Sequence, residues 1–111
     1  MVSQHSVHTR YRDDKVVVVS GYDRPLNELF LQVFGAEDAP LSKEECVLYS
    51  SLHEPQLDWT NINTVSDKLT ELGIKVPDSL LEGVSMDQLF HAGNRMVRHH
   101  IDRPPEVLLA G

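Results

Sequence analysis

The sequence predicts a small α+β domain, and three patterns support this fold class. Residues 16–19 are four consecutive valines. Side chains branched at Cβ favour strands, and valine on both faces of a strand places it near the centre of a sheet, covered on both sides. Residues 5–12 alternate in period two, and the chain after residue 62 shows two helical segments with apolar stripes. We therefore expect a small antiparallel sheet of three to four strands in meander order, with two C-terminal helices packed on one face.

The first two strands should form a hairpin. The alternation over residues 5–12 leaves one face of the first strand polar. Asp13 and Asp14 supply the tight turn that leads into the valine strand. The next reversal covers residues 21–25, where Pro25 keeps the preceding residue extended.

Residues 26–34 fit either a helix or a strand. As a helix, their apolar residues fall at i, i+3, i+4, i+7 and i+8, with Pro25 in the first turn and Gly35 just past the end. As a strand, alternate apolar residues divide between two faces. The valine strand needs neighbours on both of its edges, and a short turn suited to a hairpin leads into this segment. We choose the strand and keep the helix as the alternative.

A polar loop, a short strand and a second loop should follow. Residues 35–45 are polar, residues 46–49 resemble a fourth strand, and residues 50–60 form a loop that Trp59 anchors. In the fourth strand, we expect Cys46 to be a small buried apolar residue rather than a reactive thiolate.

Two helices complete the predicted fold. The first begins at a cap formed by Asn61 or Asn63 and ends at Gly73. The second should run over about residues 78–91, and Gly83 weakens its first part.

The C-terminal part is harder to interpret. Residues 94–100 either extend the second helix or return as an edge strand. Pro104 and Pro105 exclude a helix in the tail. We therefore expect a single α+β domain over residues 1–101 and a mobile C-terminal tail over residues 102–111. An open edge of so small a sheet offers a route to a homodimer.

Composition and charge restrict the classes of function. The net charge is −7, from 17 acidic and 10 basic residues, and the middle of the chain is the acidic part. That distribution argues against a nucleic-acid partner and suits a basic protein partner. No apolar stretch approaches the roughly 20 residues of a membrane span, so we expect no membrane association. The N-terminus lacks the apolar core of a signal peptide, and a lone cysteine suits a reducing compartment, so we expect a cytoplasmic protein.

The residues that could support catalysis form no recognised motif. Six histidines are present, but no ligand pair has HExxH or CxxC spacing, so we expect neither a metal nor a cofactor. Asp87, His91 and Arg95 stand at i, i+4 and i+8. An exposed ion-pair ladder is the favoured interpretation of that spacing, and an acid–base pair is the alternative. We therefore expect no catalytic residue.

Two segments are candidates for binding a partner. Tyr22, Asp23 and Arg24 lie on a rigid reversal, and tyrosine and arginine often anchor protein interfaces. His53 and Trp59, in the long loop, form the second candidate. The more ordinary interpretation is that Asp23 caps the turn while Tyr22 covers the end of the sheet.

These observations favour a non-enzymatic, acidic protein that acts as a protein-binding or regulatory module. One alternative is a small enzyme or small-ligand binder that uses a His/Asp pair in a cleft between sheet and helices. Another alternative is an inhibitor that masks a basic surface on its target, with binding that weakens as salt is added.

Overall fold

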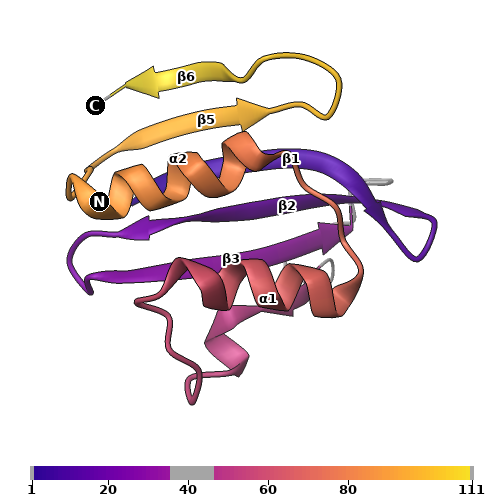
Figure 1. Cartoon of the computed structure of the whole chain (residues 1–111), viewed down its shortest axis with the longest axis horizontal. Coiled ribbons are helices and arrows are strands. Elements are labelled where there is room, and N and C mark those ends of the chain that lie inside the picture. The colour runs from indigo at the N-terminus through magenta and orange to yellow at the C-terminus, as the bar shows by residue number, and fades with distance from the viewer. Residues whose placement is uncertain (1, 36–46, 111) are drawn as a thin grey trace.

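A mixed β-sheet and two helices make up the structure. The computed structural model describes residues 2–35 and 47–110, and within them the sheet has the strand order β4-β3-β2-β1-β5-β6 (Figure 1). A short 3-10 helix, η2 (Ser51–His53), follows the fourth strand. The elements are β1 (Ser3–Tyr11), β2 (Asp14–Asp23), β3 (Glu28–Gly35), β4 (Val47–Ser50), α1 (Ile62–Leu72), α2 (Asp78–Leu89), β5 (Arg95–His99) and β6 (Glu106–Ala110).

The core lies between the helices and one face of the sheet. Both helices lie on the same side of the sheet (Figure 1), with α2 against β1 and β2 and α1 against β3. Burial of apolar surface in this layer is the main stabilising contribution to such a fold. The buried core side chains are Val7, Val16, Val18, Tyr22, Leu29, Leu31, Val33, Trp59, Val65, Leu69, Ile74, Leu80 and Val84.

The valine strand is β2, which lies inside the sheet between β1 and β3 as predicted. Val16 and Val18 point toward the helices and are fully buried. Val17 and Val19 point to the opposite face, because side chains alternate along a strand, and they are only partly buried. The prediction of complete cover on both faces is therefore wrong for the described residues, in which both helices cover the same face.

Residues 26–34 lie largely within β3, so the strand interpretation is confirmed and the helical alternative is wrong. β3 pairs antiparallel with β2 along its whole length. The turn between them is closed by the Asn27 N–H, which donates to the Arg24 carbonyl at 3.2 Å. Asn27 adopts a φ of 54°, a left-handed conformation that asparagine tolerates better than most residues.

The prediction of three to four antiparallel strands in meander order is wrong in two respects. The sheet has more strands than predicted, and one of its pairs is parallel. β5 pairs with β1 in parallel, and β6 pairs antiparallel with β5. The two helices carry the chain across one face of the sheet to the free edge of β1, where β5 adds as a parallel neighbour. Residues 94–100 therefore supply an inner strand rather than a helix or an edge. Residues 106–110, which the sequence analysis placed in a mobile tail, form the edge strand β6.

The helices begin and end close to the predicted positions. The Asn61 side chain caps α1 by accepting from the Asn63 N–H, and Gly73 ends it in the left-handed conformation with a φ of 75°. α2 stops at Leu89, two residues earlier than predicted, and continues through Gly83. No helix in the described part of the chain is long and apolar enough to cross a membrane. Cys46 and its predicted burial lie outside the described residues.

Gly83 has a packing role that its low helix propensity does not reveal. An added Cβ at this position would lie 2.5 Å from the His5 Cε1 atom. Such a distance is far below van der Waals contact, so only glycine lets α2 approach β1 this closely.

Candidate functional site

Two segments that are far apart in sequence meet beside the turn between β2 and β3. A groove of about 220 Å³ lies there. We call it the turn groove, and its principal lining residues are Asp23, Leu26, Glu28, Leu52, Pro55 and Trp59. Its walls are the β2–β3 turn, the start of β3 and the segment from η2 to residue 59.

Backbone hydrogen bonds hold the two walls together. The Leu29 N–H donates to the Trp59 carbonyl at 2.6 Å, which attaches the loop to the first part of β3. The Trp59 indole is buried, and its Nε1–H donates to the Glu54 carbonyl at 2.8 Å. On the other wall, the Asp23 carboxylate accepts from the Leu26 N–H at 3.3 Å. The backbone of the groove is therefore fixed by the fold itself.

The Glu54 side chain anchors the loop from its other side. Tyr49 in β4 donates its hydroxyl proton to Glu54 at 2.7 Å, and the Lys68 ammonium of α1 lies 2.9 Å from the same carboxylate. The hydrogen bond from Tyr49 has the largest effect in lowering the pKa of Glu54, and Lys68 lowers it further, because both partners favour the charged carboxylate. The loop is thus attached to β4 and to α1 as well as to β3.

The surface of the turn groove combines apolar and acidic chemistry. Leu26 is 65% exposed and Leu52 is 78% exposed, which is unusual for two leucines beside one cavity. The carboxylates of Asp23 and Glu28 also line it. An apolar surface bordered by negative charge matches a ligand segment that is apolar and positively charged.

The predicted partner-binding residues divide between this groove and its surroundings. Asp23 and Trp59 line the turn groove, so the first and second candidate segments meet in one place. Arg24 and His53 are exposed but do not line it. Tyr22 is buried and donates its hydroxyl proton to the Asn27 amide oxygen at 2.7 Å, so it supports the turn from below.

Sequence reasoning missed the two exposed leucines. The spacing of apolar residues places Leu26 in the pattern of the next element, and Leu52 lies within a loop that offers no periodic pattern. The sequence nevertheless contains an indication of these two positions, because each is a large aliphatic residue, one inside a turn and the other inside a polar loop. Such residues lack a core position and therefore mark exposed apolar surface.

A chain of hydrogen bonds lies buried between α2 and the sheet. His5 Nε2 is 2.6 Å from Asp87 Oδ2, and His5 Nδ1 is 2.8 Å from His99 Nε2. His99 Nδ1 is 2.8 Å from the Ser79 hydroxyl, and Arg95 donates to the second Asp87 oxygen at 3.2 Å. We call these five residues the histidine network. It links β1, α2 and β5, which are remote in sequence.

The contacts of the histidine network assign its protons. With both imidazoles neutral and protonated on Nε2, His5 donates to Asp87, His99 donates to His5, and Ser79 donates to His99. Burial lowers the pKa of His5, although the neighbouring Asp87 carboxylate opposes that effect. Burial, followed by repulsion from His5, lowers the pKa of His99 to about 4. Both imidazoles are therefore neutral near pH 7.

The predicted Asp87–His91–Arg95 ladder is replaced by a different arrangement. Asp87 is 1% exposed and contacts His5 and Arg95, whereas α2 ends before His91. His91 has a φ of 51° and lies 3.0 Å from the Tyr22 hydroxyl. A His/Asp pair does form between sheet and helix, but its histidine is His5. The signal available in the sequence was that His5 shares the buried face of β1 with Val7.

The histidine network is closed to ligands in this structure. His5, Asp87 and His99 are each at most 2% exposed, and none of them lines a principal cavity of the described residues. Every buried polar side-chain atom of the described chain has a partner. No cluster of three or more candidate metal ligands occurs within residues 2–35 and 47–110. The network can stabilise the fold, since satisfied buried polar groups specify one packing arrangement.

Comparison with known proteins gives no guide to the function, so the two candidate sites are judged on their own geometry. No protein-family model, curated protein or solved structure matches the chain. Of the two candidate sites, the turn groove is open and carries exposed apolar side chains, whereas His5, Asp87 and His99 at the centre of the histidine network are buried. The turn groove is therefore the better candidate for a functional site.

Proposed function

We propose that this protein is a non-enzymatic binding module that holds an apolar, basic segment of another protein in the turn groove. The observation that supports this function is the pairing of two highly exposed leucines, Leu26 and Leu52, with carboxylates at Asp23 and Glu28 on one fixed backbone frame. Exposed apolar side chains in a preformed concave site favour association, because binding removes them from water without a large ordering cost.

The overall charge of the chain supports a basic partner. A net charge of −7 attracts a positively charged protein over several ångströms and speeds its encounter. Acidic side chains at the groove then favour a cationic segment over a neutral one. We place this binding in a reducing, cytoplasmic compartment, which suits a chain with one cysteine.

Accessibility favours the binding module over the small enzyme. The enzyme alternative needs a substrate within hydrogen-bond reach of a histidine or carboxylate. The paired side chains of His5 and Asp87 are each 1% exposed and already bonded to each other. An exposed groove without an acid–base pair suits recognition better than chemistry.

The inhibitor alternative shares the chemistry of the turn groove. A module with a negatively charged border can cover a basic surface that its partner needs for activity. The two functions differ only in the effect on the partner, so an activity assay of the bound partner separates them.

A second copy of the chain is a further proposed partner. β6 is an edge of the sheet, and its Val107 and Leu108 are 57% and 48% exposed. An edge strand with exposed apolar side chains can pair with another strand through free backbone groups. We expect light scattering to detect a homodimer that Leu108→Lys weakens, and a wild-type monomer at high concentration would contradict this expectation.

Affinity capture with matched variants tests the main proposal. The wild type, the double variant Leu26→Ser/Leu52→Ser and the control Ile101→Ser are each immobilised and exposed to a lysate of the native host. Ile101 is a suitable control because it is 60% exposed and does not line the turn groove. We expect at least one protein to bind the wild type and Ile101→Ser but not the double variant.

The captured protein must also have the expected chemistry. Fragment mapping should locate the bound segment in a sequence that is both apolar and basic, and added salt should weaken its binding. Circular dichroism confirms that each variant is folded. Capture that is equal for all three proteins, or a bound segment that is acidic, would exclude the turn groove as the docking site.

A further inference from the structure

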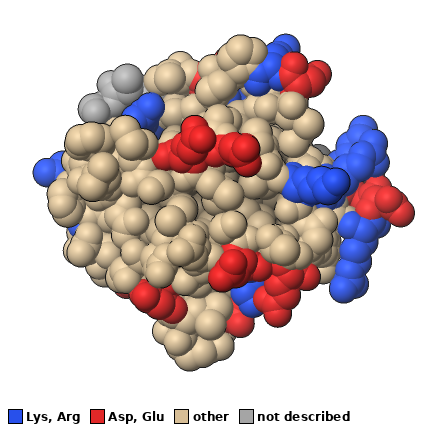
Figure 2. All heavy atoms as spheres, in the orientation of Figure 1, with Lys and Arg blue, Asp and Glu red and all other residues tan. Residues whose placement is uncertain are grey.

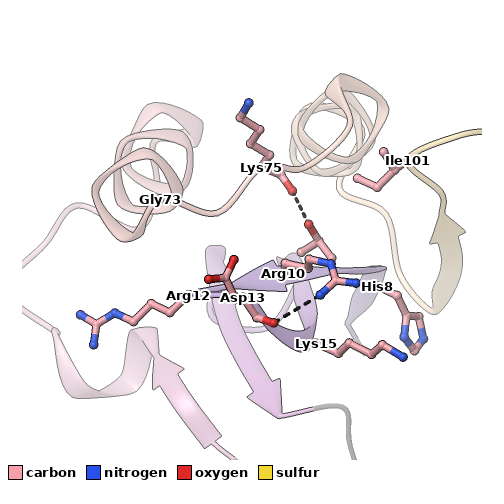
Figure 3. A pocket seen from close by; sticks show the side chains of 9 residues that line it. His8, Arg10, Arg12, Asp13, Lys15, Gly73, Lys75 and Ile101 are labelled. Carbon is pink, nitrogen blue, oxygen red and sulfur yellow. Dashed lines mark hydrogen bonds between the residues drawn. The ribbon is translucent and has the colours of Figure 1, made fainter.

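A second groove lies beside the β1–β2 hairpin. This hairpin and the β2–β3 turn lie at opposite ends of the sheet (Figure 1). Its volume is about 740 Å³. The hairpin, the connection between α1 and α2 and the segment that follows β5 supply its lining (Figure 3). We call it the hairpin groove, and the lining residues that matter here are Arg10, Arg12, Asp13, Lys15, Lys75 and Ile101.

The hairpin groove gathers positive charge in an acidic protein. Four of the ten lysine and arginine residues of the chain line it, together with one carboxylate. Figure 2 shows basic side chains concentrated at this end of the molecule and acidic side chains across the helical face. Among the described residues, none of these four cations forms a salt bridge. Within residues 2–35 and 47–110, these four cations are therefore left without a paired carboxylate, as a groove that binds an anion requires.

The walls of the hairpin groove are held in place by backbone geometry. Arg12 and Asp13 form the two-residue turn, with φ values of 53° and 69°, and both positive values match a tight hairpin. Thr9 donates its hydroxyl proton to the Lys75 carbonyl at 2.8 Å, which joins β1 to the connection between the helices. Arg10 donates to the Asp13 carbonyl at 3.3 Å (Figure 3). The backbone around the groove is thus held in place.

The long basic side chains can close around an anion. Figure 3 shows Arg12 and Lys15 on opposite sides of the hairpin, while the Lys75 ammonium extends outward from the α1–α2 connection. Like charges favour this separation. Flexible exposed side chains need only rotamer changes to converge on a negative ligand that neutralises them.

We infer that the hairpin groove binds a small ligand that carries two or more phosphate groups. The guanidinium groups of Arg10 and Arg12 match the geometry of phosphate oxygens, and Lys15 and Lys75 add point charges. The volume lies in the usual range for small-molecule sites. Ile101, which is 60% exposed, offers an apolar wall to the body of the ligand. The acidic remainder of the chain repels a long nucleic acid, so a small ligand fits better.

Calorimetry and amide NMR test this inference on the full chain, with ATP, pyrophosphate, AMP and inorganic phosphate as probes at low ionic strength. We expect ATP and pyrophosphate to bind more tightly than AMP or inorganic phosphate, since they place more charge between the cations. We also expect the amide shifts to concentrate in residues 8–15, in residues 73–75 and at residue 101. Added salt should weaken the binding of every probe.

Two double variants distinguish specific binding in the hairpin groove from non-specific electrostatic attraction of an anion. Arg10→Gln/Lys15→Gln should lower the affinity for ATP by about tenfold or more, because contacts to charged groups are worth about that factor. The control Arg24→Gln/Arg98→Gln removes the same charge outside the groove and should change the affinity by less than about twofold, because exposed charges at a distance are screened.

Several results would overturn the inference. One is no binding of ATP or pyrophosphate at millimolar concentration. Another is an equal loss of affinity in both double variants, which would indicate a long-range charge effect only. An oligonucleotide or an oligoglutamate peptide that binds as tightly as ATP would identify a general polyanion surface instead. This site is separate from the turn groove, so its failure would leave the proposed protein-binding function unaffected.

Discussion

At the scale of single residues, the buried histidines decide how the helices sit on the sheet. His5 occupies a position in β1 where alternation directs the side chain toward α2. Its two ring nitrogens then bond to Asp87 and to His99, which lie 82 and 94 residues further along the chain. A buried polar chain of this kind costs free energy unless all members are paired, so it favours one arrangement of β1, α2 and β5.

Stability should therefore depend on pH in a defined direction. The pKa of His99 is about 4 in the folded protein, against 6.5 for an unperturbed histidine, and the pKa of His5 is also lowered. The unfolded state thus binds more protons below about pH 6.5, and the free energy of unfolding should fall as pH decreases from there toward 4. For His99 alone, this shift corresponds to at most about 3 kcal/mol.

Urea denaturation between pH 4 and pH 8 measures this dependence. His99→Gln should flatten the decrease, whereas the control His53→Gln, an exposed histidine in η2, should retain it. A wild-type stability that does not change between pH 5 and pH 7 would be inconsistent with neutral, buried imidazoles.

Gly83→Ala provides a second test at the residue scale. Alanine favours helices over glycine by about 1 kcal/mol, so propensity alone predicts stabilisation of α2. The added Cβ would instead collide with the His5 ring, and we expect a net loss of about 1–3 kcal/mol. Thermal or urea unfolding measures the change, with Ser85→Ala on the same helix as a control that should be neutral or slightly stabilising. Increased stability of Gly83→Ala would show that α2 does not approach β1 this closely.

At the scale of elements, one edge strand of the sheet, β6, comes from the C-terminal segment that the sequence predicts to be a mobile tail. β6 pairs with β5, and Val97 is opposite Val107. A chain truncated after Arg103 should lose about 1–2 kcal/mol of stability, because a few cross-strand pairs contribute some tenths of a kcal/mol each. Urea unfolding measures this loss. Removal of Gly111 alone is the control. Equal stability of both truncated chains would contradict a stabilising role of β6 and support the predicted mobile tail.

The elements also show how much of the fold the sequence could predict. Valine branching, the alternation in β1 and the caps at Asn61 and Gly73 are local signals, and they correctly placed β1, β2 and α1. β5 and β6 are each five residues long, and such short runs do not distinguish a strand from a helix end or a loop. The parallel pairing of β1 with β5 depends on the path of the crossover, which no local pattern encodes.

The candidate site was predictable only in part for the same reason. Asp23 and Trp59 were identified from their chemistry, and the structure brings both to the turn groove. Their meeting depends on the hydrogen bond between Leu29 and the Trp59 carbonyl, a contact across 30 positions of sequence. The partner of Asp87 could not be identified from helical spacing, because the true partner lies on another element.

At the scale of the whole molecule, two grooves of opposite character lie at opposite ends of one sheet. The turn groove is apolar with carboxylates in its lining, and the hairpin groove is mainly basic. Separation by the length of the strands limits direct interaction between charges at the two ends under physiological salt. Each groove can therefore select its ligand independently, and the account of the protein as a binding module depends on the turn groove.

Photocrosslinking in the native host tests that central claim most directly. A photoreactive amino acid replaces Leu52 in one variant and Ile101 in a second, since both side chains are exposed and only Leu52 lines the turn groove. We predict a discrete crosslinked product at position 52 whose attached peptide is apolar and basic, and no such product at position 101. The absence of any product at position 52, or the same product from both positions, would contradict docking in the turn groove.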